Sequence, residues 1–155
     1  MFDQKNRVWQ CKSFSDLSAL ELHRLLSLRA AVFVVEQNCP YLDPDSKDEH
    51  AFHVMAWDGI EMVACARILP AGISYDEVSI GRVATSASVR GSGVGKMLMT
   101  KTMEFIQNLF GNVPVKISAQ SYLQKYYEGY GFLRTEKKEY LEDDIPHLEM
   151  IYYSK

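Results

Sequence analysis

A strand-like run and a helix-like run meet at a cluster of glycines in the middle of the chain, and this junction constrains the fold more than any other feature. Residues 77–85 (EVSIGRVAT) carry the β-branched side chains typical of a strand. Residues 94–110 repeat apolar side chains at helical spacing and are followed by Gly111, a helix stop. Residues 113–120 are strand-like again, so the three segments predict a strand–helix–strand unit with a right-handed crossover.

The remaining segments alternate in type along the chain. Asp58 and Gly59 stand between two apolar runs, which predicts a hairpin. We expect a mixed sheet with helices on both faces, in the α/β (α+β mixed) class. No repeat or linker interrupts the sequence, so residues 1–155 are expected to form a single domain. Further strands are predicted at residues 7–14, 51–57, 62–69, 131–143 and 147–153, one long helix or two abutting helices at 13–37, a loop at 38–50 and a short helix at 121–130.

Charge, hydropathy and cysteine spacing exclude several classes of function. A formal net charge of −3 gives no broad electrostatic reason to bind nucleic acid or an anionic membrane. The apolar run at residues 30–35 is far short of the roughly 20 residues that cross a bilayer, and the start lacks the apolar core of a signal peptide. We therefore expect a cytoplasmic protein. Three widely spaced cysteines, Cys11, Cys39 and Cys65, argue against a disulfide framework or a CxxC metal site.

Two familiar phosphate-binding patterns fit the glycine cluster poorly. A Walker loop requires a glycine five positions before Gly95, where Arg90 stands, and Met97 replaces its Ser or Thr. A dinucleotide fingerprint counted from Gly91 places its third glycine on Lys96. Both readings, and with them a nucleotide-binding protein, are disfavoured.

A third pattern, Arg/Gln-x-x-Gly-x-Gly/Ala, is met by Arg90, Gly93 and Gly95. Glycines at a helix start let the backbone approach an anion, towards which the free N–H groups and the positive end of the helix dipole point. The alternative is a glycine-rich connection that only lets the helix pack closely on the sheet. The pattern resembles the acetyl-CoA loop of the GCN5-related N-acetyltransferase (GNAT) superfamily.

A second motif downstream strengthens this resemblance. Tyr127 stands four residues before Gly131 and Phe132, as in that superfamily, and Gln120 occupies a position usually held by Asn. Residues 25–45 include LRAAVFVVEQNCPYLDPD, which with IGRVA, SAQSYL and EDDIPHLEM is similar to the ElaA-like family. The resemblance implies a GNAT fold: a mixed, mostly antiparallel, twisted sheet of six to seven strands, flanked by helices on both faces, whose two central strands splay apart.

The resemblance also implies a reaction and a cosubstrate. We expect an N-acetyltransferase that moves an acetyl group from acetyl-CoA to a primary amine, of a small molecule or an exposed amino group, by direct attack in a ternary complex. A CoA-binding sensor or partner-regulated module with little turnover is the alternative. No metal is expected. The residues implied to bind CoA are Val83, Ala84, Thr85, Arg90, Gly91, Ser92, Gly93, Val94, Gly95, Lys96 and Gln120.

Two residues are candidates for the chemistry. Glu77 stands where many members of the superfamily place a base, and its alternative role is a solvated carboxylate at a strand end. Tyr127 is the candidate acid for the departing thiolate, or a hydrogen-bond donor to the sulfur, and its alternative role is aromatic packing. A backbone N–H near Val83 is expected to stabilise the developing oxyanion.

The acceptor side is less constrained by the sequence. The acid-rich segments 43–49 and 142–144 would suit a cationic amine, although the first reads most simply as a solvated loop without the spacing of a calcium site. Residues 147–153 are expected either to stay within a monomer or to pair with a second copy in a homodimer. Candidate acceptor residues, which would otherwise be ordinary surface or packing side chains, are Arg29, Phe33, Glu36, Gln37 and His147.

Overall fold

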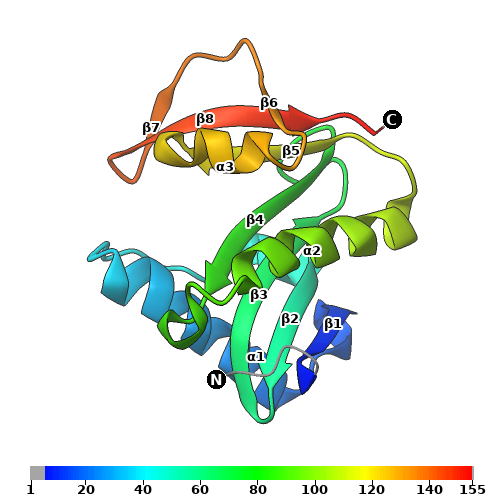
Figure 1. The fold of residues 1–155 in the computed structure, drawn as a ribbon, viewed down its shortest axis with the longest axis vertical. Coiled ribbons are helices and arrows are strands. Elements are labelled where there is room, and N and C mark those ends of the chain that lie inside the picture. The colour runs from blue at the N-terminus through cyan, green and yellow to red at the C-terminus, as the bar shows by residue number, and fades with distance from the viewer. Residues whose placement is uncertain (1–5, 155) are drawn as a thin grey trace.

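An open, twisted eight-stranded sheet forms the centre of the computed structural model, which describes residues 6–154 (Figure 1). Residues 1–5 and 155, which the predicted domain also includes, lie outside the described residues. The strands are β1 (Val8–Ser13), β2 (Phe52–Asp58), β3 (Glu61–Leu69), β4 (Val78–Thr85), β5 (Val115–Gln120), β6 (Leu133–Arg134), β7 (Tyr140–Glu142) and β8 (Ile145–Tyr152). The helices are α1 (Ala19–Arg29), continued by a π-helix (Ala30–Glu36), α2 (Val94–Phe110) and α3 (Gln124–Glu128), with 3-10 turns at Phe14–Asp16, Ser46–His50, Ala87–Val89 and Ser121–Leu123.

The order of strands across the sheet is β1-β2-β3-β4-β5-β8-β6, and β7 also pairs with β8. Every neighbouring pair is antiparallel except β4 and β5, which are parallel. The predicted mixed, mostly antiparallel sheet is therefore confirmed, with short β6 and β7 raising the number of strands to eight.

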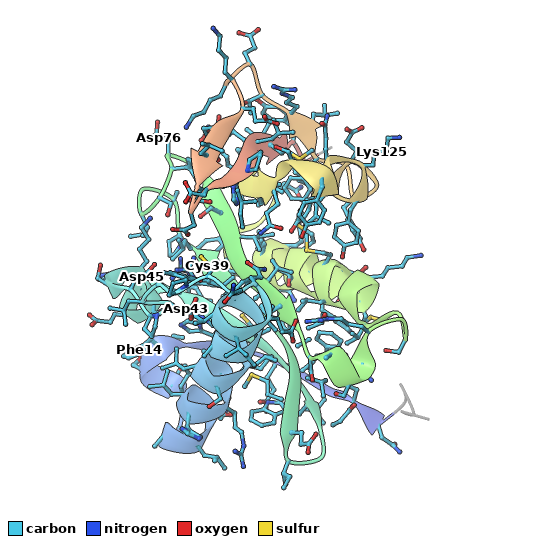
Figure 2. The ribbon with its side chains drawn as sticks, turned by 90° about the vertical axis from the view of Figure 1, so that its left-hand side faces the viewer. Phe14, Cys39, Asp43, Asp45, Asp76 and Lys125 are labelled. Carbon is cyan, nitrogen blue, oxygen red and sulfur yellow. The ribbon has the colours of Figure 1, made fainter. Side chains whose placement is uncertain are left out.

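Helices cover both faces of the sheet, as predicted. The amphipathic helix α2 buries Leu98 and Met99 against one face. On the other face α1 and the π-helix bury Leu25, Leu28 and Val32 against Met55 and Cys65. Figure 2 shows α1 and α2 on opposite sides of the strands. Burial on both faces explains why β2 and β3 are nearly continuous apolar runs rather than alternating ones.

β4 and β5 separate after a short stretch of pairing. Their parallel register runs from Val78 opposite Val115 to Ile80 opposite Ile117 and ends there. β4 also carries an extra residue relative to β3, a bulge at Arg82, whose φ of 51° is unusual for a residue with a side chain. Figure 1 shows β4 leaving the direction of β5 and β8 at a steep angle. The predicted splay of the two central strands is confirmed.

One prediction about the C-terminal third is wrong. The single strand expected at residues 131–143 is divided into β6 and β7 by a loop. The strand expected at residues 147–153 corresponds to β8, which pairs with β5 on one side and with β6 and β7 on the other. The choice between a monomer and a homodimer stays a prediction. Separately, no helix within residues 6–154 has the length and apolar character to cross a membrane.

Candidate functional site

A cavity of about 820 Å³ lies where β4 and β5 part. The π-helix and the segment that follows it form one wall, and β4 and β5 form the floor. The opposite wall comes from the β7–β8 hairpin and from residues 120–127, which lead into α3. The volume lies within the usual range for small-molecule and cofactor sites.

The first turn of α2 follows the glycine cluster at one end of β4. Gly91 and Gly93 have φ values of 81° and 86°, a region that disfavours other residues, and Gly93 is the N-cap. No side chain caps this helix end, and the N–H of Met97 donates to the carbonyl of the N-cap Gly93. The N–H groups of residues 94–96 therefore precede the intrahelical ladder, which makes this end a ready site for an anion.

Arg90 lies between this loop and the π-helix. Its Nη2 donates to the backbone carbonyl of Thr85 at 2.9 Å and is 2.7 Å from the Glu36 carboxylate. Both Arg90 and Glu36 line the cavity. The arginine is thus held at the cavity rim beside the glycine loop.

Tyr127 reaches the cavity from the other side, because of a tight turn after α3. The N–H of Phe132 donates to the carbonyl of Tyr127, and Gly131 has a φ of 95°, with the Tyr152 ring only 3.1 Å from where a Cβ would stand. Phe132 is fully buried and meets the edge of the Tyr127 ring. Burial raises the pKa of Tyr127 to about 12, so the phenol stays protonated at any ordinary pH. Neighbouring Tyr126 donates to the carbonyl of Gly95, which ties α3 to the first turn of α2.

The first acid-rich segment is not a solvated loop, as had been expected. Asp43 and Asp48 are only 3% and 6% exposed. Arg29, 1% exposed, donates from Nε to Asp43 at 2.8 Å and from Nη1 and Nη2 to the two oxygens of Asp48 at 2.8 and 3.2 Å. Arg29 therefore lies behind the cavity in a buried ion network, and not on its surface as an acceptor residue. Asp43 and Asp45 lie beside α1 in Figure 2.

Two further arginines complete this network at the cavity wall. Arg67 on β3 donates from Nη1 to Asp45 at 2.6 Å and to Asp48 at 2.9 Å. Arg82, at the bulge of β4, pairs through Nε with Asp43 at 2.9 Å and lies over the Tyr41 ring. The bulge conformation is thereby fixed by charge contacts to residues about 40 positions away.

The second acid-rich segment does face the cavity. Glu142 accepts hydrogen bonds from Ser118 Oγ at 3.3 Å and lies 3.1 Å from His147 Nε2. The other ring nitrogen of His147, Nδ1, is 2.7 Å from the Ile145 carbonyl, and the imidazole stacks on Tyr140. Both ring nitrogens of His147 thus face oxygen atoms, which fixes the orientation of the imidazole beside Glu142.

Glu77 lies outside the cavity. Its carboxylate is 3.0 Å from Lys116 Nζ, which is also 3.7 Å from Glu149. The hydrogen bond that Lys116 donates to Glu77 raises the pKa of Lys116 above its ordinary value. Glu77 lies directly before β4, which begins at Val78, and the sequence did not reveal its partner Lys116 on β5.

Most of the residues predicted from sequence come together in one place. Val94 is the exception within the glycine loop, because its side chain is buried in the core under α2. Gly91, Ser92, Gly93, Gly95 and Lys96 form the loop and first helical turn, while Phe33, Glu36, Gln37, Val83, Ala84, Thr85, Arg90, Gln120, Tyr127 and His147 line the cavity.

The sequence analysis missed several residues of the cavity wall. Arg67 carried a signal, since it is the single charged residue in the apolar run 62–69 and a buried arginine requires acidic partners. Arg82 carried the same signal, because it is a charged residue inside the strand-like run 77–85. The cavity-lining residues that were not predicted include Tyr41, Lys47, Arg67, Tyr75, Arg82 and Ser118.

Comparison with known proteins gives one consistent result. A family model described as an acetyltransferase (GNAT) domain matches residues 30–154. The protein ElaA of Escherichia coli (strain K12) is 44% identical over 144 residues, which cover 92% of this chain and 94% of ElaA.

Two solved structures are similar over nearly their whole length. An acyl-CoA N-acyltransferase from Pseudomonas aeruginosa matches with a TM-score of 0.90 and 42% identity, covering 94% of this chain and 99% of that one. The crystal structure of Escherichia coli ElaA matches with a TM-score of 0.87 and 42% identity, with the same coverage. The residues matched by the family model, 30–154, include those that line the cavity.

Proposed function

This chain belongs to the GNAT acetyltransferase domain family, and from that premise we propose that it moves an acetyl group from acetyl-CoA to a primary amine. Its family and its structural relatives support acyl transfer from CoA. The observation that carries the proposal is the cavity between β4 and β5, which ends beside the uncapped, glycine-lined start of α2. An elongated donor with an anionic diphosphate fits this combination of an open strand edge and an anion site.

We assign the diphosphate of CoA to the glycine loop and the N–H groups of residues 94–96, with Arg90 and Lys96 as charged partners. Beyond Ile80, β4 no longer pairs with β5, and its free edge at Val83, Ala84 and Thr85 offers backbone groups to the amides of the pantetheine arm. Gln120 at the end of β5 faces the same space. In this arrangement the N–H near Val83 is available to an oxyanion that forms on the acyl carbon. Bound acetyl-CoA would supply the acyl group as a thioester, which an amine attacks directly.

The amine must lose a proton before or during attack. With a pKa near 10.4, neutralising a lysine-like amine at pH 7 costs about 4 to 5 kcal/mol. The carboxylate of Glu142 lines the cavity and accepts hydrogen bonds there, so it is better placed than Glu77 to bind the ammonium group.

We expect Glu77→Gln to lower kcat by less than about threefold, because Lys116 already occupies this carboxylate and the pair lies outside the cavity. Steady-state rates with acetyl-CoA and a primary amine, measured from pH 6 to 9, check this. A 100-fold loss of kcat with unchanged affinity for CoA would instead establish Glu77 as the base.

Tyr127→Phe is expected to lower kcat about 10- to 100-fold with little change in affinity for CoA. Since the pKa of Tyr127 is raised to about 12, full proton transfer to a thiolate of pKa near 8.5 would cost about 5 kcal/mol. Donation of a hydrogen bond to the charged sulfur is worth about 1.5 to 3 kcal/mol, which sets the expected loss.

Tyr153→Phe is the matched control for this variant, because it removes a phenol from an exposed site outside the cavity. A protonated Tyr127 also predicts that the rate does not fall with rising pH below about pH 11. An unchanged kcat for Tyr127→Phe would leave the ring with a packing role alone.

The proposed function is tested by measuring thiol release from acetyl-CoA with a panel of primary amines, with mass spectrometry of the acetylated products. We expect amine-dependent release and a mass increase of one acetyl group. Tight CoA binding by calorimetry without release on any acceptor would favour the alternative of a CoA-binding sensor.

A further inference from the structure

Resting on the proposed function, we propose that the acceptor is a small amine that also carries an anionic group, a carboxylate or a phosphate. Arg67 and Lys47 on one wall of the cavity bind the anion. Glu142 on the opposite wall holds the ammonium group.

Arg67 supplies the first evidence for an anion site. Arg67 is only 5% exposed and lines the cavity. Nη1 is used by Asp45 and Asp48, whereas Nε has no hydrogen-bond partner among residues 6–154. A buried charged donor without a partner is costly, and such groups in native proteins call for a ligand or water. Arg67 stands opposite Gly81 in the strand register, where an added Cβ would meet nothing within 4 Å, so the wall is open at this point.

Lys47 supplies the second piece of evidence for an anion site. Its Nζ donates to Ser74 Oγ at 2.8 Å, and within the described part of the chain no carboxylate lies within ion-pair distance of it. Lys47 also lines the cavity. The ion network of this wall pairs three arginines with three aspartates, and its members Asp45, Arg67 and Arg82 line the cavity. Because these charges balance, Lys47 leaves the wall with one cation in excess.

The opposite wall has the opposite charge. Glu142 and Asp143, at the tip of the β7–β8 hairpin, both line the cavity, and the Glu142 side chain is about half exposed. Ser118 donates a hydrogen bond to the Glu142 carboxylate, and the His147 ring contacts the same carboxylate and orients it. A ligand that spans the cavity therefore meets carboxylates on one side and, on the other, Lys47 and Arg67 beside the ion-paired Asp45. An excess of negative charge on one wall and of positive charge on the other is the complement of a zwitterion.

The cationic wall is remote from the loop assigned to the CoA diphosphate. Lys47 contacts Ser74, which precedes the first residue of β4, whereas the glycine loop follows its last residue. An eight-residue strand covers about 25 Å. Lys47 and Arg67 are thus available to bind the anionic group of the acceptor, while Arg90 and Lys96 bind the diphosphate of CoA.

Matched acceptor pairs test the inference. β-Alanine, 4-aminobutyrate and 6-aminohexanoate would each be compared with its neutral amide, and phosphoethanolamine with ethanolamine, by kcat/KM at fixed acetyl-CoA. We expect at least one anionic amine to exceed its neutral partner tenfold or more. The carboxylate and phosphate arms identify which anion is preferred. Neutral amines acetylated as well as their anionic partners would overturn the inference and leave the proposed function intact.

Variants of Lys47 complete the test without disturbing the buried arginines. Lys47→Gln should reduce the preference for the anionic partner at least threefold, and Lys47→Arg should keep it. Lys101→Gln, on α2 and outside the cavity, is the matched control for loss of one positive charge. An unchanged preference in Lys47→Gln would exclude Lys47 from the site.

A binding measurement covers the case in which no acceptor is acetylated. Calorimetry of 6-aminohexanoate and its amide with the CoA-saturated protein should show binding of the first and not of the second. Equal binding of the two, or none, would overturn the inference, whereas selective binding without turnover would uphold it and count against the proposed function.

Discussion

Replacing Gly95 with aspartate is expected to weaken CoA binding at least 100-fold while the protein remains folded. Gly95 lies in the first turn of α2, where the proposal places the diphosphate. A carboxylate about 4 Å from a phosphate at a partly exposed site costs about 4 kcal/mol, and 1.4 kcal/mol is tenfold in affinity. An acidic residue in a first helical turn is favourable for the helix itself, so the melting temperature should not fall.

The matched control is Gly95→Ala, which adds volume without charge. A Cβ at Gly95 would lie 3.6 Å from the Tyr126 hydroxyl, an ordinary contact, so this variant should fold and lose much less affinity than the aspartate variant. Calorimetric titration with CoA measures both. Retained affinity in Gly95→Asp would show that the diphosphate binds elsewhere, and the functional proposal would lose its main support.

Asp48→Asn is expected to destabilise the protein by about 3 to 5 kcal/mol. Asp48 accepts hydrogen bonds from both Arg29 and Arg67, and neutralising it leaves two buried guanidinium groups without their shared carboxylate. Urea unfolding at pH 7 measures the change. Glu49→Gln, at the exposed neighbouring position, is the control and should stay within about 0.5 kcal/mol. A similarly small effect of Asp48→Asn would show that the network is not important for stability.

The same carboxylate gives stability a pH dependence of defined sign. Burial alone would raise the pKa of Asp48, but hydrogen bonds and charge from Arg29, with help from Arg67, outweigh it and lower the pKa to about 2. A lowered folded-state pKa stabilises the protein above the unfolded value near 4, and this stabilisation is lost as the pH falls from about 4 towards 2. In Asp48→Asn the stability should fall less steeply over this range.

The parts of the site that were predictable depend on short stretches of chain. The glycine pattern with Arg90, and the four-residue spacing from Tyr127 to Gly131, each describe a local turn whose conformation glycine alone permits. In the structure Arg90 and Tyr127 both line one cavity. The roles of Glu77 and of the residues proposed to contact CoA stay predictions until the variants are measured.

The sequence by itself determined the strand–helix–strand unit, the mixed sheet and the glycine loop, because hydrophobic period and backbone freedom act between near neighbours. Only the tertiary structure decided which charges meet. Arg29 could equally have faced an acceptor, and Asp43 could have faced water, until the fold joined them in a buried pair. The fold likewise placed Glu77 within ion-pair distance of Lys116. An ion pair depends on distance in space, and side chains that are 14 or 39 positions apart carry no local signal of the partner that folding will bring to them.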